Sequence, residues 1–306
     1  MIFYLFPRDV FTGIATYPLS VLPNLEVTDS LPTQWNATLL NYVSPLSLQL
    51  EIPSAVNAVQ ALGYQSFAAL GDAIVNPHQW TFQFPLFLLQ ETKNFIAFAL
   101  NYINRIHPVA IWAILRSPDG QEYTHFICSI ALLTNISLQF PNAGNATLSL
   151  TFSVPFARTF QGNAPALNAM RPASVNTRGL TIRDLHIVPR GGNEAEVLSL
   201  VINIRRDVNW HYTTFASYHS LVARRAATMF TVAPVMPQGN ITLGYPFGFS
   251  FLQDADLKPL STIDIHIWDL MTLTLEGVKA MSWGEDLSAA NVGINLRFSF
   301  LGWEIS

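Results

Sequence analysis

Charged side chains are scarce in this sequence. Of its 306 residues only 12% are Asp, Glu, Lys or Arg, about half the fraction that is usual in a soluble domain. The net charge is −4, and the 16 Lys and Arg residues form neither a run nor a basic stripe. Tight binding to nucleic-acid phosphates is therefore disfavoured, because such binding needs clustered cations. So few charges also suggest that much of the surface is covered by other molecules.

Cysteine and long apolar runs are scarce too. Cys128 is the one cysteine of the sequence and lies in an apolar run, so we expect a buried structural thiol rather than a disulfide or a nucleophile. No apolar run approaches the roughly 18 to 20 residues of a membrane-spanning helix. The first ten residues lack a preceding positive charge and are interrupted by Pro7, Arg8 and Asp9, so no signal peptide is predicted. We expect a protein made in the cytoplasm, with no membrane partner.

Motifs for catalysis and cofactor binding are absent as well. The sequence contains no G-x-S-x-G elbow, no phosphate-binding glycine loop and no H-E-x-x-H helix. Candidate metal ligands are His211 with His219, eight positions apart, and His186 with His266, each in an alternating segment. His211 and His219 have no nearby Cys or carboxylate partners of the kind that zinc sites use. For His186 and His266, carboxylates could come from Asp184, Asp264 and Asp269, but Asp is also common at strand edges and turns, so ordinary strand residues are the favoured interpretation. We predict that the protein is not an enzyme, and that it has no catalytic or metal-binding residues and no cofactor.

Two segments half a chain apart show the same strict alternation of apolar and small or polar residues. Sliding residues 147–154 by 146 positions superposes them on residues 293–300. Period-two alternation predicts a β-strand with one buried face. The apolar set, predicted to pack inside a wall, is Leu148, Leu150, Phe152, Val154, Ile294, Leu296, Phe298 and Phe300. The alternate set is Thr147, Ser149, Thr151, Ser153, Asn295, Arg297 and Ser299.

The two similar strands indicate a duplicated unit. We predict a mainly β fold of two tandem similar domains, residues 1–160 and 177–306, joined by a Pro-, Ala- and Asn-rich linker at 161–176. Each domain is expected to be a β-sandwich or β-barrel unit with a strand, one amphipathic helix (93–106 and 213–230), a meander and a final hairpin.

Some segments break the predicted repeat. Residues 1–45 and 54–72 have no visible partner in the second half, and 54–72 is predicted to be either a short helix or a long ordered loop. The last hairpin of the second half is about four residues longer, which places a longer turn at 283–290.

The two final hairpins, TNISLQFPNAGNATLSLTFSVPF and LEGVKAMSWGEDLSAANVGINLRFSF, resemble those of tail tube proteins of long-tailed bacteriophages. The type VI secretion tube protein is similar in architecture. The resemblance covers roughly residues 80–160 and 179–303 and rests on element order and hairpin character, since no diagnostic motif fixes it.

The resemblance implies a structural virion protein, located in the tail and assembled in the host cytoplasm. It would form stacked rings that make a hollow tube for DNA ejection. Because family members usually contribute one unit per chain to a hexameric ring, two units in tandem imply homotrimeric rings with pseudo-sixfold symmetry. The apolar set would then pack in the wall and the alternate set would face the lumen. DNA would be a partner only in transit, and the tape measure and terminator proteins would be further partners.

Other readings remain open. A capsid, decoration or baseplate component would share the β-rich composition with few charges. An outer-membrane β-barrel would share the alternation, although the missing export signal disfavours it. A monomeric sandwich, or a carbohydrate- or metal-binding β-barrel of cupin type, would use the two faces as core and solvent sides.

Overall fold

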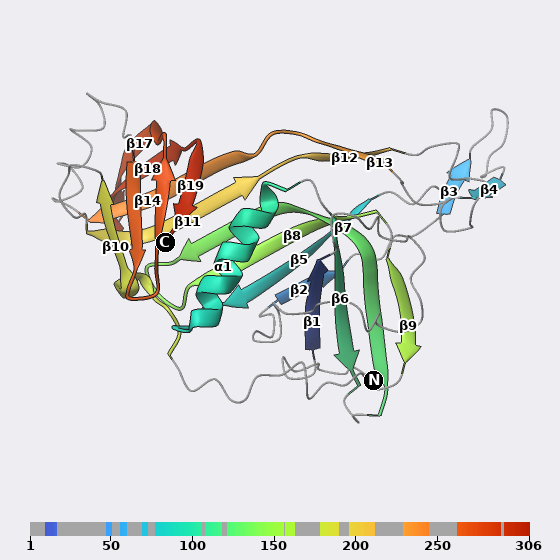
Figure 1. Cartoon of the computed structure of the whole chain (residues 1–306). Helices are drawn as coiled ribbons and strands as arrows, with labels where there is room; N and C mark the ends of the chain where they lie inside the picture. Colours follow the sequence, from blue (N-terminus) through green and yellow to red (C-terminus); the bar gives the residue numbers. More distant parts are fainter. Residues whose placement is uncertain are drawn as a thin grey trace.

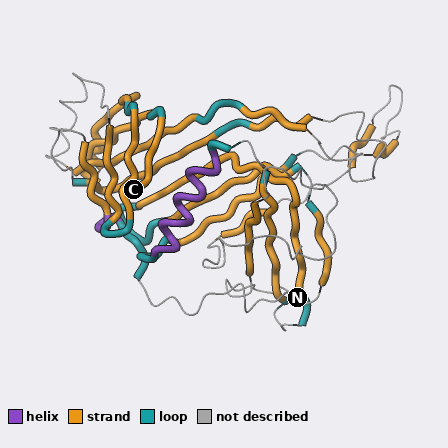
Figure 2. Tube along the Cα trace, in the orientation of Figure 1, coloured by secondary structure: helices purple, strands orange, loops and turns teal. Residues whose placement is uncertain are grey.

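A computed structural model shows a chain that is mainly β, as the sequence predicts. The structure describes residues 10–16, 47–50, 56–59, 69–72, 77–105, 108–117, 121–155, 157–162, 178–189, 196–211, 229–244, 262–288 and 291–306. Strands dominate this part of the chain, which contains one α-helix (Figure 2).

One large sheet contains strands from both halves of the chain (Figure 1). Its main path runs β17-β18-β14-β11-β7-β8-β5-β2, and all neighbours are antiparallel. The bounds are Lys279–Ser288 (β17), Asn291–Ser299 (β18), Met236–Gly244 (β14), Val197–Arg205 (β11), Tyr123–Phe140 (β7), Thr147–Val154 (β8), His78–Pro85 (β5) and Ser47–Leu50 (β2). The strands β7 and β11 join the two halves.

The long strand β7 pairs with different partners along its 18 residues. Its first part pairs with β6 (Val109–Arg116) and β9 (Arg158–Gly162), and its last part pairs with β8 and β11. β6 pairs in turn with β1 (Val10–Thr16). β6 and β7 form an antiparallel hairpin, and residues 118–120 of its connection lie outside the described residues.

A separate four-stranded sheet has the order β10-β15-β16-β19. Its strands are Leu185–Pro189 (β10), Thr262–Ile267 (β15), Met271–Glu276 (β16) and Gly302–Ile305 (β19), and a 3-10 turn at Ile182–Asp184 precedes β10. Two further two-stranded ribbons are present, one at the right and one at the top of Figure 1. They are β3 (Val56–Val59) with β4 (Ala69–Asp72), and β12 (Val208–His211) with β13 (Met229–Val232).

The pairing pattern of the first half recurs in the second. β8 lies between β7 and β5 with β2 beyond, and β18 lies between β17 and β14 with β11 beyond. The series β1-β6-β7-β9 recurs as β10-β15-β16-β19, and the ribbon β3–β4 recurs as β12–β13. These elements follow the same order along the chain in both halves. Gly277 and Val278 separate β16 from β17, whereas β7 runs on without a break.

A β-bulge recurs at the matching position. The β7–β8 register shifts at Leu133/Asn135, next to Phe152, and the β17–β18 register shifts at Ala280/Ser282, next to Phe298. Phe152 and Phe298 are 146 positions apart (298 − 152), which is the offset found from the sequence. Bulges are specific features of strand pairing, so the match supports the equivalence of β8 and β18.

Helix α1 (Gln90–Ile103) covers the apolar side of the first-half strands. It begins and ends three residues earlier than the predicted 93–106, and the expected apolar face is buried. Phe95 packs edge-on against Phe84 of β5, with ring centroids 5.1 Å apart. The buried cluster contains apolar residues of both halves together with Cys128, which confirms the expected burial of this thiol.

Three expectations about single segments are wrong for the residues that are described. Residues 56–59 and 69–72 form an antiparallel ribbon instead of a helix or loop, and this ribbon has a second-half counterpart in β12–β13. Residues 283–288 belong to β17, so the extra length goes into the strand and not into a turn. Met229, expected on a helix, starts β13; the rest of the predicted helix, 213–228, lies outside the described residues.

The domain division predicted from sequence stays a prediction. Of the expected linker, Gln161 and Gly162 form the end of β9, and residues 163–176 lie outside the described residues. Pairing between β7 and β11 makes the large sheet continuous across the proposed boundary.

Candidate functional site

The two repeat strands have the predicted two-faced character. Every residue of the apolar set, in β8, in β18 and at Phe300 just after β18, is at most 2% exposed. In the alternate set Arg297 is exposed and the others are half-buried, except Ser153, which is 8% exposed. The alternation is therefore confirmed, while the wall and lumen roles of these residues stay predictions.

The polar side of β8 and β18 continues across the neighbouring strands. Antiparallel register places directly opposed residues on the same face, so the partners of the alternate set can be identified. We call the resulting surface the polar face. Besides the alternate set it contains Gln79, Thr81, Gln83, Asn135, Ser137, Gln139, Ser199, Asn203, Gln238, Asn240 and Thr242.

Hydrogen bonds between strands hold these hydroxyl and amide groups in place. The Ser199 hydroxyl donates to Thr242 Oγ1 at 2.8 Å, and the Thr242 hydroxyl donates to Asn295 Oδ1 at 2.7 Å. In the first half Thr81 Oγ1 and Thr151 Oγ1 lie 3.1 Å apart. Such ladders satisfy the polar groups within the sheet, so the surface is hydrophilic without being charged.

Charges on this face are few and solvated. Arg297 donates to Gln238 Oε1 at 3.0 Å, and Arg205 forms an exposed ion pair of 2.9 Å with Asp207. Lys279 lies opposite Ser299 at the sheet edge. Exposed ion pairs contribute little to stability, so these groups mainly tune the electric potential of the surface.

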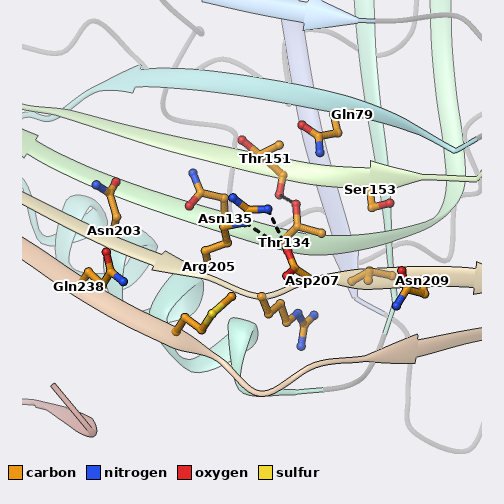
Figure 3. A pocket seen from close by; sticks show the side chains of 13 residues that line it. Gln79, Thr134, Asn135, Thr151, Ser153, Asn203, Arg205, Asp207, Asn209 and Gln238 are labelled. Atoms are coloured by element: carbon orange, nitrogen blue, oxygen red, sulfur yellow. Dashed lines mark hydrogen bonds and ion pairs between the residues drawn. The ribbon is translucent and has the colours of Figure 1, made fainter. Parts of the chain in front are cut away.

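A hollow of about 930 Å³ lies on the polar face where the two halves meet (Figure 3). Residues of β5, β7, β8, β11 and β14 line it together with the start of β12. Figure 3 shows that the labelled side chains end mainly in amide and hydroxyl groups. Groups of this kind can bind water or a polar polymer but provide no nucleophile paired with a base.

Ser153 differs from the rest of the alternate set. Trp210 of β12 donates from Nε1 to Ser153 Oγ at 2.7 Å, and its ring packs edge-on against Phe230 of β13. The β12–β13 ribbon thus covers the end of β8 within this chain. The hydroxyl of Ser153 is therefore bonded to that ribbon, whereas the hydroxyl of Thr151, which also lines the hollow, lies next to Thr81 of the sheet.

Arg206 joins the two halves beside the hollow. This arginine is 2% exposed; it donates from Nε to the Leu133 carbonyl (2.8 Å) and from Nη1 to the carbonyls of Ile103 (2.7 Å) and Arg105 (2.8 Å). A cation at the carbonyl end of α1 is favourable. Burial lowers the pKa of Arg206 and raises the pKa of neighbouring Tyr102 to about 12.

The histidine candidates are only partly brought together. His186 and His266 lie directly opposite each other on β10 and β15, and His266 Nδ1 is 2.9 Å from Thr272 Oγ1. His211 is exposed and bonded to Thr231, whereas His219 lies outside the described residues. In the part of the chain that the structure describes, no group of three or more His, Cys, Asp or Glu is arranged to hold a metal ion.

Sequence reasoning missed two features of this site. The polar side of β14 was not recognised, although Gln238, Asn240 and Thr242 alternate with other residues as the repeat strands do. The role of Arg206 had no local signal, because its partners are about 70 to 100 positions away in sequence.

Comparisons with known proteins add no relative. No protein-family model matches this chain, and no curated protein sequence matches it significantly. Within the part of the chain that the structure describes, no helix is both long and apolar enough to cross a bilayer.

Proposed function

We propose that this chain is a structural protein whose copies associate edge to edge into rings, and that the rings stack into a hollow tube. In this proposal the chain consists of two tandem similar units. The resemblance to phage tail tube proteins suggests that the tube is a virion tail that conducts DNA.

The observation that carries the proposal is the strand order of the large sheet. The order β17-β18-β14-β11 is followed by β7-β8-β5-β2, and the strands match one to one in pairing and direction. Within the chain, β11 of one unit pairs with β7 of the other. The two ends of the path, β2 and β17, are the counterparts of β11 and β7, so they are complementary edges. Head-to-tail contacts of this kind either close a ring or continue as a filament, and closure removes the exposed edges.

The polar face supports a lumen. Amide and hydroxyl groups already paired along the sheet offer DNA a wet surface with few cations, so phosphates would slide past without being held. The hollow on this face lies among strands of both halves and is lined mainly by uncharged polar side chains. The apolar side is occupied by α1 and the buried core.

If six units close the ring, as in the family that this chain resembles, each ring contains three chains. Mass measurement of isolated rings tests this number. A ring mass of three chains is expected, and six chains per ring would contradict the pseudo-sixfold arrangement.

The deciding experiment is negative-stain electron microscopy of the purified protein at rising concentration. Hollow tubes with a regular axial repeat are expected. Closed shells would instead favour a capsid or decoration role, and dispersed monomers at all concentrations would contradict self-assembly.

A second candidate is binding of a carbohydrate in the hollow, favoured by its lining of amide and hydroxyl groups with Arg205 and Asp207. Isothermal titration of the dispersed protein with oligosaccharides tests it. Saturable heat with a monomeric protein would support this candidate over the tube.

A further inference from the structure

The edge strand β17 exposes large apolar side chains. Trp283 is 46% exposed and Met281 is 52% exposed, although both lie on a sheet strand. Trp283 lies opposite Leu296, on the buried side of the sheet. An aromatic residue on that side, at an unpaired edge, is an association site unless something covers it.

The pairing of β7 with β11 inside the chain, which we call the inner joint, shows what covers the position equivalent to Trp283. Ile136 of β7 lies opposite Leu150 just as Trp283 lies opposite Leu296, which gives an offset of 147 positions (283 − 136). Ile136 is fully buried, because Ile204 of β11 lies on its other side. Among the described strands, Trp283 has a neighbour on one side only, β18.

The same argument relates β2 to β11. Leu48 pairs with Phe82 as Leu200 pairs with Ile241, an offset of 152 positions (200 − 48). All four residues of β2 keep this offset relative to β11. The counterpart of Ile204 is then Ile52, which lies outside the described residues.

We propose that β2 of one copy pairs with β17 of a second copy in the register of the inner joint, with Trp283 as the apolar anchor of the contact. The inner pairs Leu200↔Phe140, Val201↔Gln139 and Ile202↔Leu138 become three pairs between chains. These are Leu48 with Leu287, Gln49 with Asp286 and Leu50 with Glu285. This register presupposes the proposed self-assembly, but self-assembly could also occur through a different register.

The two joints differ in what holds them. The inner joint has Arg206, whose guanidinium is bonded to three carbonyl oxygens of the first half. By the offset of 152 the counterpart of Arg206 is Ser54, which has no long cationic side chain. The proposed contact between β2 and β17 of two copies, the outer joint, therefore lacks an arginine of this kind. In that joint Trp283 takes the place of Ile136. Buried aromatic anchors dominate the energy of such contacts.

Cysteine cross-linking tests the register. The double variant Gln49→Cys/Asp286→Cys places thiols on opposite edges of one chain, where only another copy can bridge them, and Cys128 is fully buried. Cross-strand neighbours lie within disulfide reach. Under mild oxidation we expect covalent oligomers that end at a closed trimer. The control Gln49→Cys/Leu287→Cys moves one thiol to the other face and should give at least about tenfold less product.

The outcomes separate this proposal from the proposed function. If rings or tubes form but the control links better than the Gln49/Asp286 pair, the register is overturned and self-assembly stands. If the unmodified protein forms no rings or tubes and neither pair links, both proposals fail.

A second variant tests the anchor. Trp283→Ala should raise the concentration needed for assembly at least about tenfold, because it removes the covered ring. Trp268→Ala is the matched control, since Trp268 is 51% exposed and lies on the β15–β16 turn, outside the edge strands β2 and β17. Equal assembly of the two variants would overturn the role of Trp283.

Discussion

Asp184 shows how one buried carboxylate ties the start of the second half together. It is 2% exposed and forms an ion pair with Arg178, which donates to Oδ2 from Nη1 at 2.7 Å. It also accepts from the backbone N–H of Thr181 at 2.8 Å. The Arg178 guanidinium, helped by Thr181, holds the pKa of Asp184 below its usual range against the opposing effect of burial.

The lowered pKa predicts a pH dependence of stability. The folded state binds the Asp184 proton more weakly than the unfolded state, so the stabilisation is complete above the unfolded pKa of about 3.9 and is lost as pH falls through the folded pKa. Asp184→Asn should lower the free energy of unfolding by about 1–2 kcal/mol at pH 7, and the difference should shrink below about pH 4. Urea unfolding at both pH values measures it.

The control for this prediction is Asp269→Asn, a change on an exposed turn. It should alter the free energy of unfolding at pH 7 by less than about 0.5 kcal/mol. A difference between Asp184→Asn and the unmodified protein that stays constant with pH would show that the carboxylate charge is not the cause.

Strands β5 and β14 are counterparts in the two halves, but at one equivalent position β5 has the largest residue type and β14 has the smallest. Trp80 of β5 lies opposite Phe152, and Gly239 of β14 lies opposite Phe298, the equivalent phenylalanine. A Cβ atom at position 239 would lie 2.1 Å from the Phe298 ring. The glycine thus lets the β14 backbone and the Phe298 ring approach closely. The Phe298 ring fills the space that a side chain at position 239 would need, whereas β5 carries the large Trp80 at the equivalent position.

Gly239→Ala should therefore weaken the β14–β18 pairing. Phe298 is fully buried, so its ring would have to shift within a packed core, and we expect a loss of about 1–3 kcal/mol in the free energy of unfolding. Gly284→Ala on β17 is the matched control, because a Cβ atom there meets nothing within 4 Å. Chemical denaturation measures both variants, and equal stability would show that Phe298 adapts.

At the scale of the whole molecule, the two faces of the large sheet should respond differently to charge. Phe152 is 1% exposed and packs edge-on against Phe82. Phe152→Asp buries an unpaired carboxylate and should cost more than about 4 kcal/mol. Ser149→Asp, on the polar face of the same strand, should cost less than about 1 kcal/mol and leave a folded subunit.

Thermal unfolding and electron microscopy of both variants check this prediction. The face assignment would be wrong if Phe152→Asp left folding and assembly intact while Ser149→Asp abolished both.

Local patterns in the sequence determined the strands, the two faces and α1. Alternation at Leu148, Leu150 and Phe152 reports burial on one side of a strand, and the spacing of Phe95, Ile96 and Ala99 reports one side of a helix. These are properties of neighbouring residues, so they can be read without knowing the fold. The offset of 146 positions was visible for the same reason.

Only the tertiary structure decided which strands are neighbours. It made β14 the counterpart of β5, and it revealed that residues 56–59 and 69–72 form a ribbon equivalent to β12–β13. It also brought Arg206 to carbonyl groups about 70 to 100 positions away. Strand pairing and such long-range contacts depend on how distant segments pack together, which local periodicity does not encode.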